Sequence, residues 1–309
     1  MKRHCGFGTG TTASLGVVML LLLSPALVAC GGSSTKAATS PSATPFAAAT
    51  PVALVGSDSV AVTQRVVDLA RAALHAPTAA KLARPYADDV VVDDFTFNGH
   101  FTGKAAVVEA FRANLRGYSG ARWVAGYAGR GWAVIEERWD FTKTNQGEIE
   151  LVAVQETRGG KVVHEGDYYQ YGDLPTGTPL QPKPLTSAPG PADTPAAAAG
   201  VALQYAAALQ AQDAAAMAAL SAPTIAFMDT ASSTVGDSPG QVQAHYAKIF
   251  TPPSGWSLNF TQLRYAFGAG WAAVLWTAGG DGVTMLEIRD GKIARETLYY
   301  NRGNVLLVP

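Results

Sequence analysis

The sequence has little charge of either sign and almost no cysteine. Charged residues make up 15% of the 309, and the 23 basic and 24 acidic residues give a net charge of −1. There is no basic excess to neutralise phosphates, which excludes nucleic acid as a partner. The cysteines are Cys5 and Cys30, both in the first tenth of the chain. Cys5 would leave with the signal peptide predicted below, so no disulfide can form within the mature chain, and its core alone must hold the fold.

The N-terminal segment is typical of a secretory signal. After two basic residues, residues 17–29 form a mostly apolar run, which is too short for a bilayer span of about 20 residues. The run ends in Leu27-Val28-Ala29-Cys30 and resembles a bacterial lipobox. The resemblance implies a lipoprotein signal peptide over 1–29 and attachment of acyl chains such as palmitate to Cys30. The predicted location is the extracytoplasmic face of the cell membrane, reached through this lipid anchor. An ordinary signal with a chance cysteine is the alternative.

Two segments are rich in proline, serine, threonine and alanine and cannot bury enough apolar surface to fold. Residues 30–57 are predicted to be a disordered tether, and residues 173–195, which contain seven prolines, a linker. They separate two predicted domains, residues 58–172 and residues 196–309.

The two domains repeat each other. Gly160–Tyr169 matches Gly291–Tyr300 at a constant offset of 131, and Gly131-Trp132-Ala133 echoes Gly270-Trp271-Ala272. In each domain, apolar residues at helical spacing come first, then a strand, a further helix and a meander of alternating strands. Helices followed by an antiparallel sheet predict the α+β class.

Three features of the first domain resemble the SnoaL-like domains of the nuclear transport factor 2-like, or cystatin-like, fold. They are Tyr86-Ala87-Asp88-Asp89 before an apolar strand, Gly103-Lys104 opening a helix, and the closing strand with Tyr168-Tyr169. The resemblance covers 58–172 well and 196–309 more loosely. It implies two cone-shaped domains, each a curved antiparallel sheet packed on N-terminal helices around an apolar pocket. It implies little about chemistry, because this fold hosts isomerases, cyclases, dehydratases, scaffolds and binders.

The same resemblance places Asp94 at the general base of ketosteroid isomerases. The two positions that supply the oxyanion hole of those enzymes fall near Ala70 and near Val152 here, so the dominant electrostatic stabilisation is missing. Alternation along the strand places Glu137 on the pocket-lining face, where burial would raise its pKa. The catalytic candidates are therefore Asp94, Glu137 and His164, the last as a polar partner. A strand-end carboxylate that reaches solvent is the alternative for Asp94.

Aromatic residues at a spacing of two along the strands favour either a sheet core or a cavity for an apolar ligand. The residues predicted to line such pockets are Trp123, Trp139, Tyr168, Phe227, Asp229, Trp271, Trp276 and Tyr299. No His, Asp and Glu set has the spacing of a metal site, and no nucleophile motif or phosphate loop occurs in the mature chain. We therefore expect no metal and no cofactor.

These patterns predict a lipid-anchored envelope protein that binds a small apolar ligand or a partner protein through SnoaL-like pockets. One alternative is an enzyme of isomerase, cyclase or hydrolase type that uses Asp94 as general base. Another is a non-catalytic scaffold that forms a homodimer through its sheet faces, as sheets of this superfamily often do.

Overall fold

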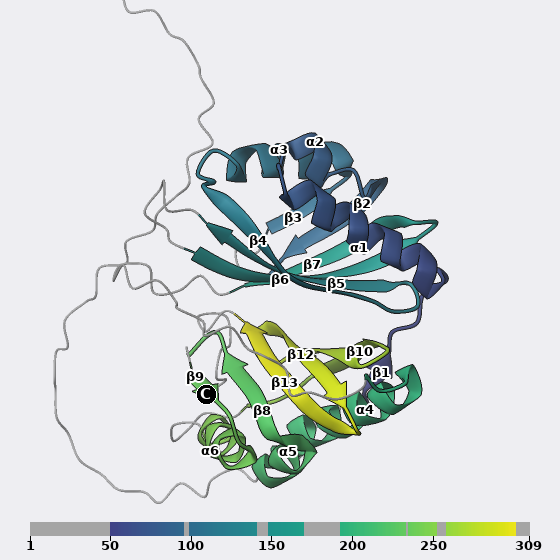
Figure 1. The fold of residues 1–309 in the computed structure, drawn as a ribbon. Helices are drawn as coiled ribbons and strands as arrows, with labels where there is room; N and C mark the ends of the chain where they lie inside the picture. The colour runs from purple at the N-terminus through teal and green to yellow at the C-terminus, as the bar shows by residue number, and fades with distance from the viewer. Residues whose placement is uncertain are drawn as a thin grey trace, which may run out of the picture. The chain divides into compact units, whose positions relative to one another are not determined.

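The computed structural model describes residues 50–95, 99–140, 148–169, 192–232, 234–251 and 258–300. Cys30 and most of the predicted tether and linker lie outside these residues. The described chain forms two β-sheets, and helices cover one face of each sheet (Figure 1). We call residues 58–169 the first half and residues 192–300 the second half.

The elements follow the predicted order in both halves. A short strand, β1 (Val52–Ala53), precedes them. The first half contains α1 (Val60–Leu74), α2 (Ala79–Leu82), β2 (Tyr86–Asp94), β3 (Gly99–Thr102), α3 (Lys104–Asn114), β4 (Gly120–Ala128), β5 (Trp132–Asp140), β6 (Glu148–Arg158) and β7 (Lys161–Tyr169). The second half contains α4 (Pro195–Ala211), α5 (Ala214–Leu220), β8 (Ser221–Asp229), β9 (Thr234–Gly236), α6 (Pro239–Ile249), β10 (Gln262–Gly268), β11 (Trp271–Thr277), β12 (Asp281–Arg289) and β13 (Lys292–Tyr300).

The two sheets have the same strand order. The first sheet runs β3-β2-β7-β6-β5-β4, and the second runs β9-β8-β13-β12-β11-β10 with β1 added at its edge. The predicted α+β class is confirmed, but the sheets are mixed rather than purely antiparallel. β7 pairs parallel with β2, and β13 pairs parallel with β8. In each half, the closing strand returns beside the first long strand after a short strand, a helix and three meander strands, and it runs parallel to that first strand.

Polar side chains fix the start of each half. Ser59 caps α1 by accepting a hydrogen bond from the backbone of Val62, and Thr194 caps α4 in the same way. The aspartates just before these caps hold the last hairpin of their own half. Asp58 accepts from the amides of Gly159 and Gly160, and Asp193 accepts from Gly291. Among the described residues, no helix combines the length and apolar character needed to cross a membrane.

Each sheet has an inner face, covered by its own helices, and an outer face. The inner faces carry the cores of the two halves: one cluster packs on α4, α5 and α6, and two smaller clusters pack on α1, α2 and α3. The outer faces share a fourth cluster, in which Val134, Val152 and Tyr168 of the first sheet join Trp271, Leu275 and Tyr299 of the second. The sheet faces that we predicted to form a homodimer thus contact each other within one chain. The homodimer itself stays a prediction.

A buried ion pair crosses this contact between the sheets. Glu136 on β5 is 0% exposed and pairs with Arg295 on β13. Tyr299 donates a hydrogen bond of 2.7 Å to the same carboxylate. Arg295 also pairs with Glu287 at 2.8 Å, and Tyr127 of the first sheet donates to Glu287 at 2.8 Å. The charge of Arg295 is therefore shared by one carboxylate from each half.

The end of the predicted tether is an ordered part of the fold. Val52 and Ala53 pair with β10 of the second sheet, and the amide of Leu54 donates to Tyr265 at 2.8 Å. Two residues later, the amide of Gly56 donates to Arg130 of the first half at 2.9 Å. A Cβ at Gly131 would lie 2.4 Å from the Cα of Gly56, so this close approach requires glycine. The prediction of disorder does not hold for these residues.

Candidate functional site

The inner face of the first sheet carries four carboxyl groups, which we call the carboxyl cluster. They are Asp94 on β2, Glu137 on β5, and Glu165 and Asp167 on β7. Strand register explains why they share a face: Asp94 lies directly beside Asp167, and Val92, two residues earlier, lies beside Glu165. Two catalytic candidates from the sequence, Asp94 and Glu137, are thus brought to one face. Glu165 and Asp167 were not predicted.

Glu165 accepts hydrogen bonds from two neighbouring side chains, Tyr86 and Gln155. The hydroxyl of Tyr86 lies 2.8 Å from both of its carboxylate oxygens, and the Nε2 of Gln155 donates at 2.5 Å. Burial raises the pKa of Glu165, and these hydrogen bonds act against the rise. The neighbouring Asp167 has a pKa well above its ordinary value, because it is buried and lies beside Glu165 and Asp94. Asp167 therefore holds the proton of this pair and shares it with Glu165.

Glu137 has a pKa that suits proton transfer near neutral pH. It is 8% exposed, and the indole Nε1 of Trp139 donates a hydrogen bond of 2.7 Å to its carboxylate. Burial raises the pKa of Glu137 to about 7, and Glu165 contributes to the rise. The hydrogen bond from Trp139 acts in the opposite direction without cancelling the shift. At pH 7 the group exists in both protonation states, as a general acid or base requires.

His164 lies on the opposite face of the sheet from Asp94 and Glu137. Its Nε2 is 2.9 Å from the carboxylate of Asp93, which also contacts the Nδ1 of His100 at 2.7 Å. Burial opposes ionisation of Asp93, but the hydrogen bonds to the two histidines outweigh it and lower the pKa. The structure therefore separates His164 from the two carboxyl groups with which it was predicted to act.

The aromatic residues predicted to line pockets lie in three places. Trp123 and Trp139 belong to the inner cluster beside α1 and α3, and Phe227 and Trp276 to the inner cluster of the second half. Tyr168, Trp271 and Tyr299 instead lie in the cluster shared by the two outer faces. Alternation predicts that neighbouring residues face opposite ways, but it does not say which face the helices cover.

Asp229 forms a turn rather than a pocket wall. It is fully buried, and its carboxylate accepts hydrogen bonds from the amides of Ala231 and Ser232 and from the hydroxyl of Tyr300. His245 lies 3.0 Å from the same carboxylate. Burial opposes ionisation, but the close contact with His245 and the hydrogen bonds from Ser232 outweigh it, and the pKa of Asp229 is lowered. These bonds satisfy the side chain within its own half.

The strand registers show which positions of the two halves correspond, so the site can be compared with the same positions in the second half. Glu165 corresponds to Glu296, which accepts from Tyr205 at 2.8 Å and from Tyr246. Asp94 corresponds to Asp229, and each accepts from the last tyrosine of its sheet, Tyr169 at 2.7 Å or Tyr300 at 3.0 Å. These two carboxyl–tyrosine arrangements occur in both halves.

Three polar positions of the first half have no polar counterpart in the second. By register, Glu137 corresponds to Trp276, Gln155 to Leu286 and Asp167 to Leu298. All three replacements in the second half are buried in its apolar core. The fold therefore accommodates apolar residues at these positions, and the polar side chains are a property of the first half alone.

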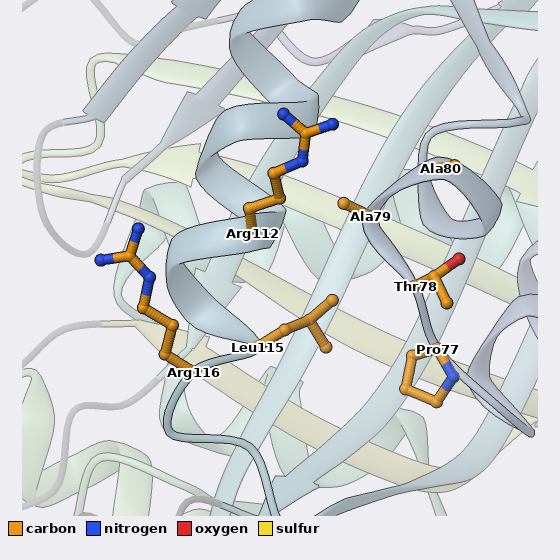
Figure 2. Close-up of a pocket in the computed structure, with 7 residues that line it drawn as sticks. All are labelled: Pro77, Thr78, Ala79, Ala80, Arg112, Leu115 and Arg116. Atoms are coloured by element: carbon orange, nitrogen blue, oxygen red, sulfur yellow. The ribbon is translucent and has the colours of Figure 1, made fainter.

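The surface near this site carries a shallow groove of about 490 Å³ between α2 and α3. Figure 2 shows Arg112, Leu115 and Arg116 of the α3 end on one side and residues 77–80 on the other. Leu115 also packs against the inner cluster that contains Trp139. In the part of the chain that the structure describes, no group of three or more His, Cys, Asp or Glu side chains is arranged to hold a metal ion.

Comparison with known protein families finds a match in the second half of the chain. Residues 202–296 match the family model of the SnoaL-like domain. The motifs of the first half carried the sequence resemblance, whereas the family model matches the half that lacks the Tyr-Ala-Asp-Asp piece. The SnoaL-like, nuclear transport factor 2-like fold is thus supported. No curated protein matches the chain.

Several solved structures resemble parts of the chain. A protein from Catenulispora acidiphila with a ketosteroid isomerase-like fold, in complex with trimethylamine, is 18% identical (TM-score 0.31; 35% of this chain and 86% of that one). A nuclear transport factor 2-like protein of unknown function from Burkholderia xenovorans is 21% identical (TM-score 0.32; 35% and 83%). A SnoaL-like protein of unknown function from Burkholderia thailandensis is 20% identical (TM-score 0.30; 35% and 94%).

Proposed function

We propose that the protein is a lipid-anchored, extracytoplasmic ligand-binding protein whose ligand sits at the carboxyl cluster of the first half. The supporting observation is the contrast between the halves at Glu137, Gln155 and Asp167. Burying polar groups costs free energy, and the second half forms the same sheet with Trp276, Leu286 and Leu298. A cost that the fold does not require is typical of a functional site.

The surroundings of the cluster suit a ligand with an apolar frame. Trp139 contacts Glu137 and also packs in a cluster with Leu74 and Leu82, and Trp123 and Tyr118 pack against this cluster. Apolar and aromatic walls with a few polar groups are the usual lining of small-molecule sites. In the second half the equivalent region holds Tyr205, Tyr246 and Trp276 in its core. We assign that half a supporting role.

Ligand binding is tested by filling the inner face. Ala153 is 5% exposed and lies between Asp167 and Ile135 in register, so Ala153→Phe would overpack this region. We expect the variant to bind N-phenyl-1-naphthylamine, a neutral apolar fluorophore, at least tenfold more weakly than the wild type. Titration followed by probe fluorescence measures the affinity.

The matched control is Ala80→Phe, which places the same side chain in the exposed groove between α2 and α3. It should leave probe affinity unchanged. Loss of binding in Ala80→Phe with retention in Ala153→Phe would move the ligand site to the groove. A further variant, Trp139→Phe, keeps the test decisive if Ala153→Phe misfolds. We expect Trp139→Phe to bind the probe, but the probe should then quench less of the protein's tryptophan fluorescence, because Trp139 lies at the carboxyl cluster.

An acid–base enzyme is the second candidate, and the observation in its favour is the pKa of about 7 at Glu137. A positioned general acid or base contributes about 10²–10⁴-fold to a rate. Glu137→Gln keeps the shape of the side chain and its contact to Trp139 but removes the titration. Turnover that vanishes in this variant while probe binding persists would favour the enzyme over the binder.

The membrane anchor is tested at Cys30. Cys30→Ser removes the only thiol of the predicted mature chain, and with it the attachment point of the acyl chains, so we expect the variant to leave the membrane fraction or to remain unprocessed. Two or three chains each bury many methylenes at about 0.8 kcal/mol, which makes release of the wild type slow. Fractionation with metabolic labelling by palmitate measures both outcomes. A Cys30→Ser protein that is still cleaved, labelled and membrane-bound would contradict the anchor.

A further inference from the structure

The carboxyl cluster contains acceptors without a matching cation. Among the described residues, no Lys, Arg or His lies within ion-pair distance of Glu137, Glu165 or Asp167. Two other buried acids of the first half are paired with a cation, Glu136 with Arg295 and Glu150 with Arg138, whereas Glu296 of the second half is held by Tyr205 and Tyr246. Buried carboxylates are normally paired, because an isolated buried charge is costly.

Gln155 provides an independent sign of a missing partner. It is 3% exposed, and its Oε1 has no hydrogen-bond partner among the described residues. Its Nε2 donates to Glu165, which holds the amide beside the carboxyl cluster. A buried acceptor without a donor costs about 1–3 kcal/mol. The equivalent position in the second half is Leu286, so the fold does not need an amide there.

Resting on the proposed function, we propose that the ligand is a protonated amine on an apolar or aromatic frame, bound by Glu137, Glu165 and Gln155. The ammonium group would supply the positive charge that the carboxyl groups lack and an N–H donor for the Oε1 of Gln155. Trp139 and Trp123 supply aromatic faces, which attract organic cations as well as apolar rings.

Three probes that share a benzyl group separate the contributions of charge and hydrogen bonding. Benzylammonium has both a charge and N–H donors, benzyltrimethylammonium has the charge alone, and benzyl alcohol has a donor without charge. We expect benzylammonium to bind the full-length protein at least tenfold more tightly than benzyl alcohol, measured by calorimetry. A hydrogen bond to a charged group is worth roughly tenfold or more in affinity.

Gln155→Leu tests the acceptor by installing the residue that the second half has. We expect it to weaken benzylammonium about tenfold and to leave benzyltrimethylammonium unchanged. The control Gln64→Leu, on the exposed surface of α1, should change neither. Equal loss of both cations in Gln155→Leu would overturn the hydrogen-bond assignment.

The test also separates this inference from the proposed function. Benzyl alcohol binding as tightly as benzylammonium would overturn the amine assignment, while N-phenyl-1-naphthylamine binding would leave the ligand site in place. Displacement of benzylammonium by equimolar Ca²⁺ would also overturn the amine assignment and would favour a metal ion as the ligand. If no probe binds, both proposals fail.

Discussion

Arg295→Met is expected to lower the free energy of unfolding by about 3–5 kcal/mol, because it leaves a buried carboxylate without its cation. Glu136 is 0% exposed and receives its positive charge from Arg295 alone among the described residues. Tyr299 still donates a hydrogen bond to it, but a hydroxyl does not replace the charge. Urea denaturation followed by tryptophan fluorescence measures the change.

The matched control removes both charges. Breaking a buried pair is costly, whereas replacing the whole pair by apolar residues of similar volume is often close to neutral. We therefore expect Glu136→Leu combined with Arg295→Met to recover most of the stability lost in the single variant. Since the pair joins the two sheets, the single variant should also make the two halves unfold less cooperatively. A single variant within 1 kcal/mol of the wild type would contradict the role assigned to the pair.

The element order and the inner-face position of Glu137 could be predicted from the sequence, because both follow from local periodicity. The repeat at an offset of 131 also aligns Glu165 with Glu296, the two inner-face glutamates that accept bonds from tyrosines. The repeat predicts a shared fold for the two halves, and it also contains this part of the site. The repeat could not reveal the tyrosines that donate these bonds, because they come from different elements in the two halves. Tyr86 lies on β2, whereas Tyr205 and Tyr246 lie on α4 and α6.

The sequence could not predict on which face of a sheet a side chain lies, or that β2 and β7 pair in parallel, because both depend on contacts between residues distant in sequence. The parallel pairing of β2 with β7 sets Asp94 beside Asp167, and it places His164 on the other face with Asp93. The purely antiparallel sheet that the sequence predicts does not contain this register. Tyr168 and Tyr299 have the spacing of pocket residues, yet each sheet buries its outer face against the other. A strand that is apolar on both faces carries no signal for which side is the interior.

Glu296→Gln is expected to remove part of the pH dependence of stability. Burial raises the pKa of Glu296 from 4.5 to about 7, while the hydrogen bonds from Tyr246 and Tyr205 limit the rise. Between these two values the folded protein holds a proton that the unfolded chain has released, so stability falls as pH rises. The contribution is complete below pH 4.5 and lost above about pH 7. The shift corresponds to about 3 kcal/mol.

The variant keeps the oxygen that accepts from Tyr205 and Tyr246 but cannot ionise. Its stability should therefore fall by about 3 kcal/mol less than that of the wild type between the two pKa values, as measured by urea denaturation across this range. The remaining fall belongs to the other carboxyl groups whose pKa values burial raises, which are Glu137, Glu150, Glu165 and Asp167. Asp93 and Asp229 do not interfere, because their lowered pKa values make them titrate at more acidic pH. Glu109→Gln, at an exposed position on α3, should follow the wild-type curve. If Glu296→Gln follows it too, the buried carboxyl group does not govern this titration, and the proton is held elsewhere in the fold.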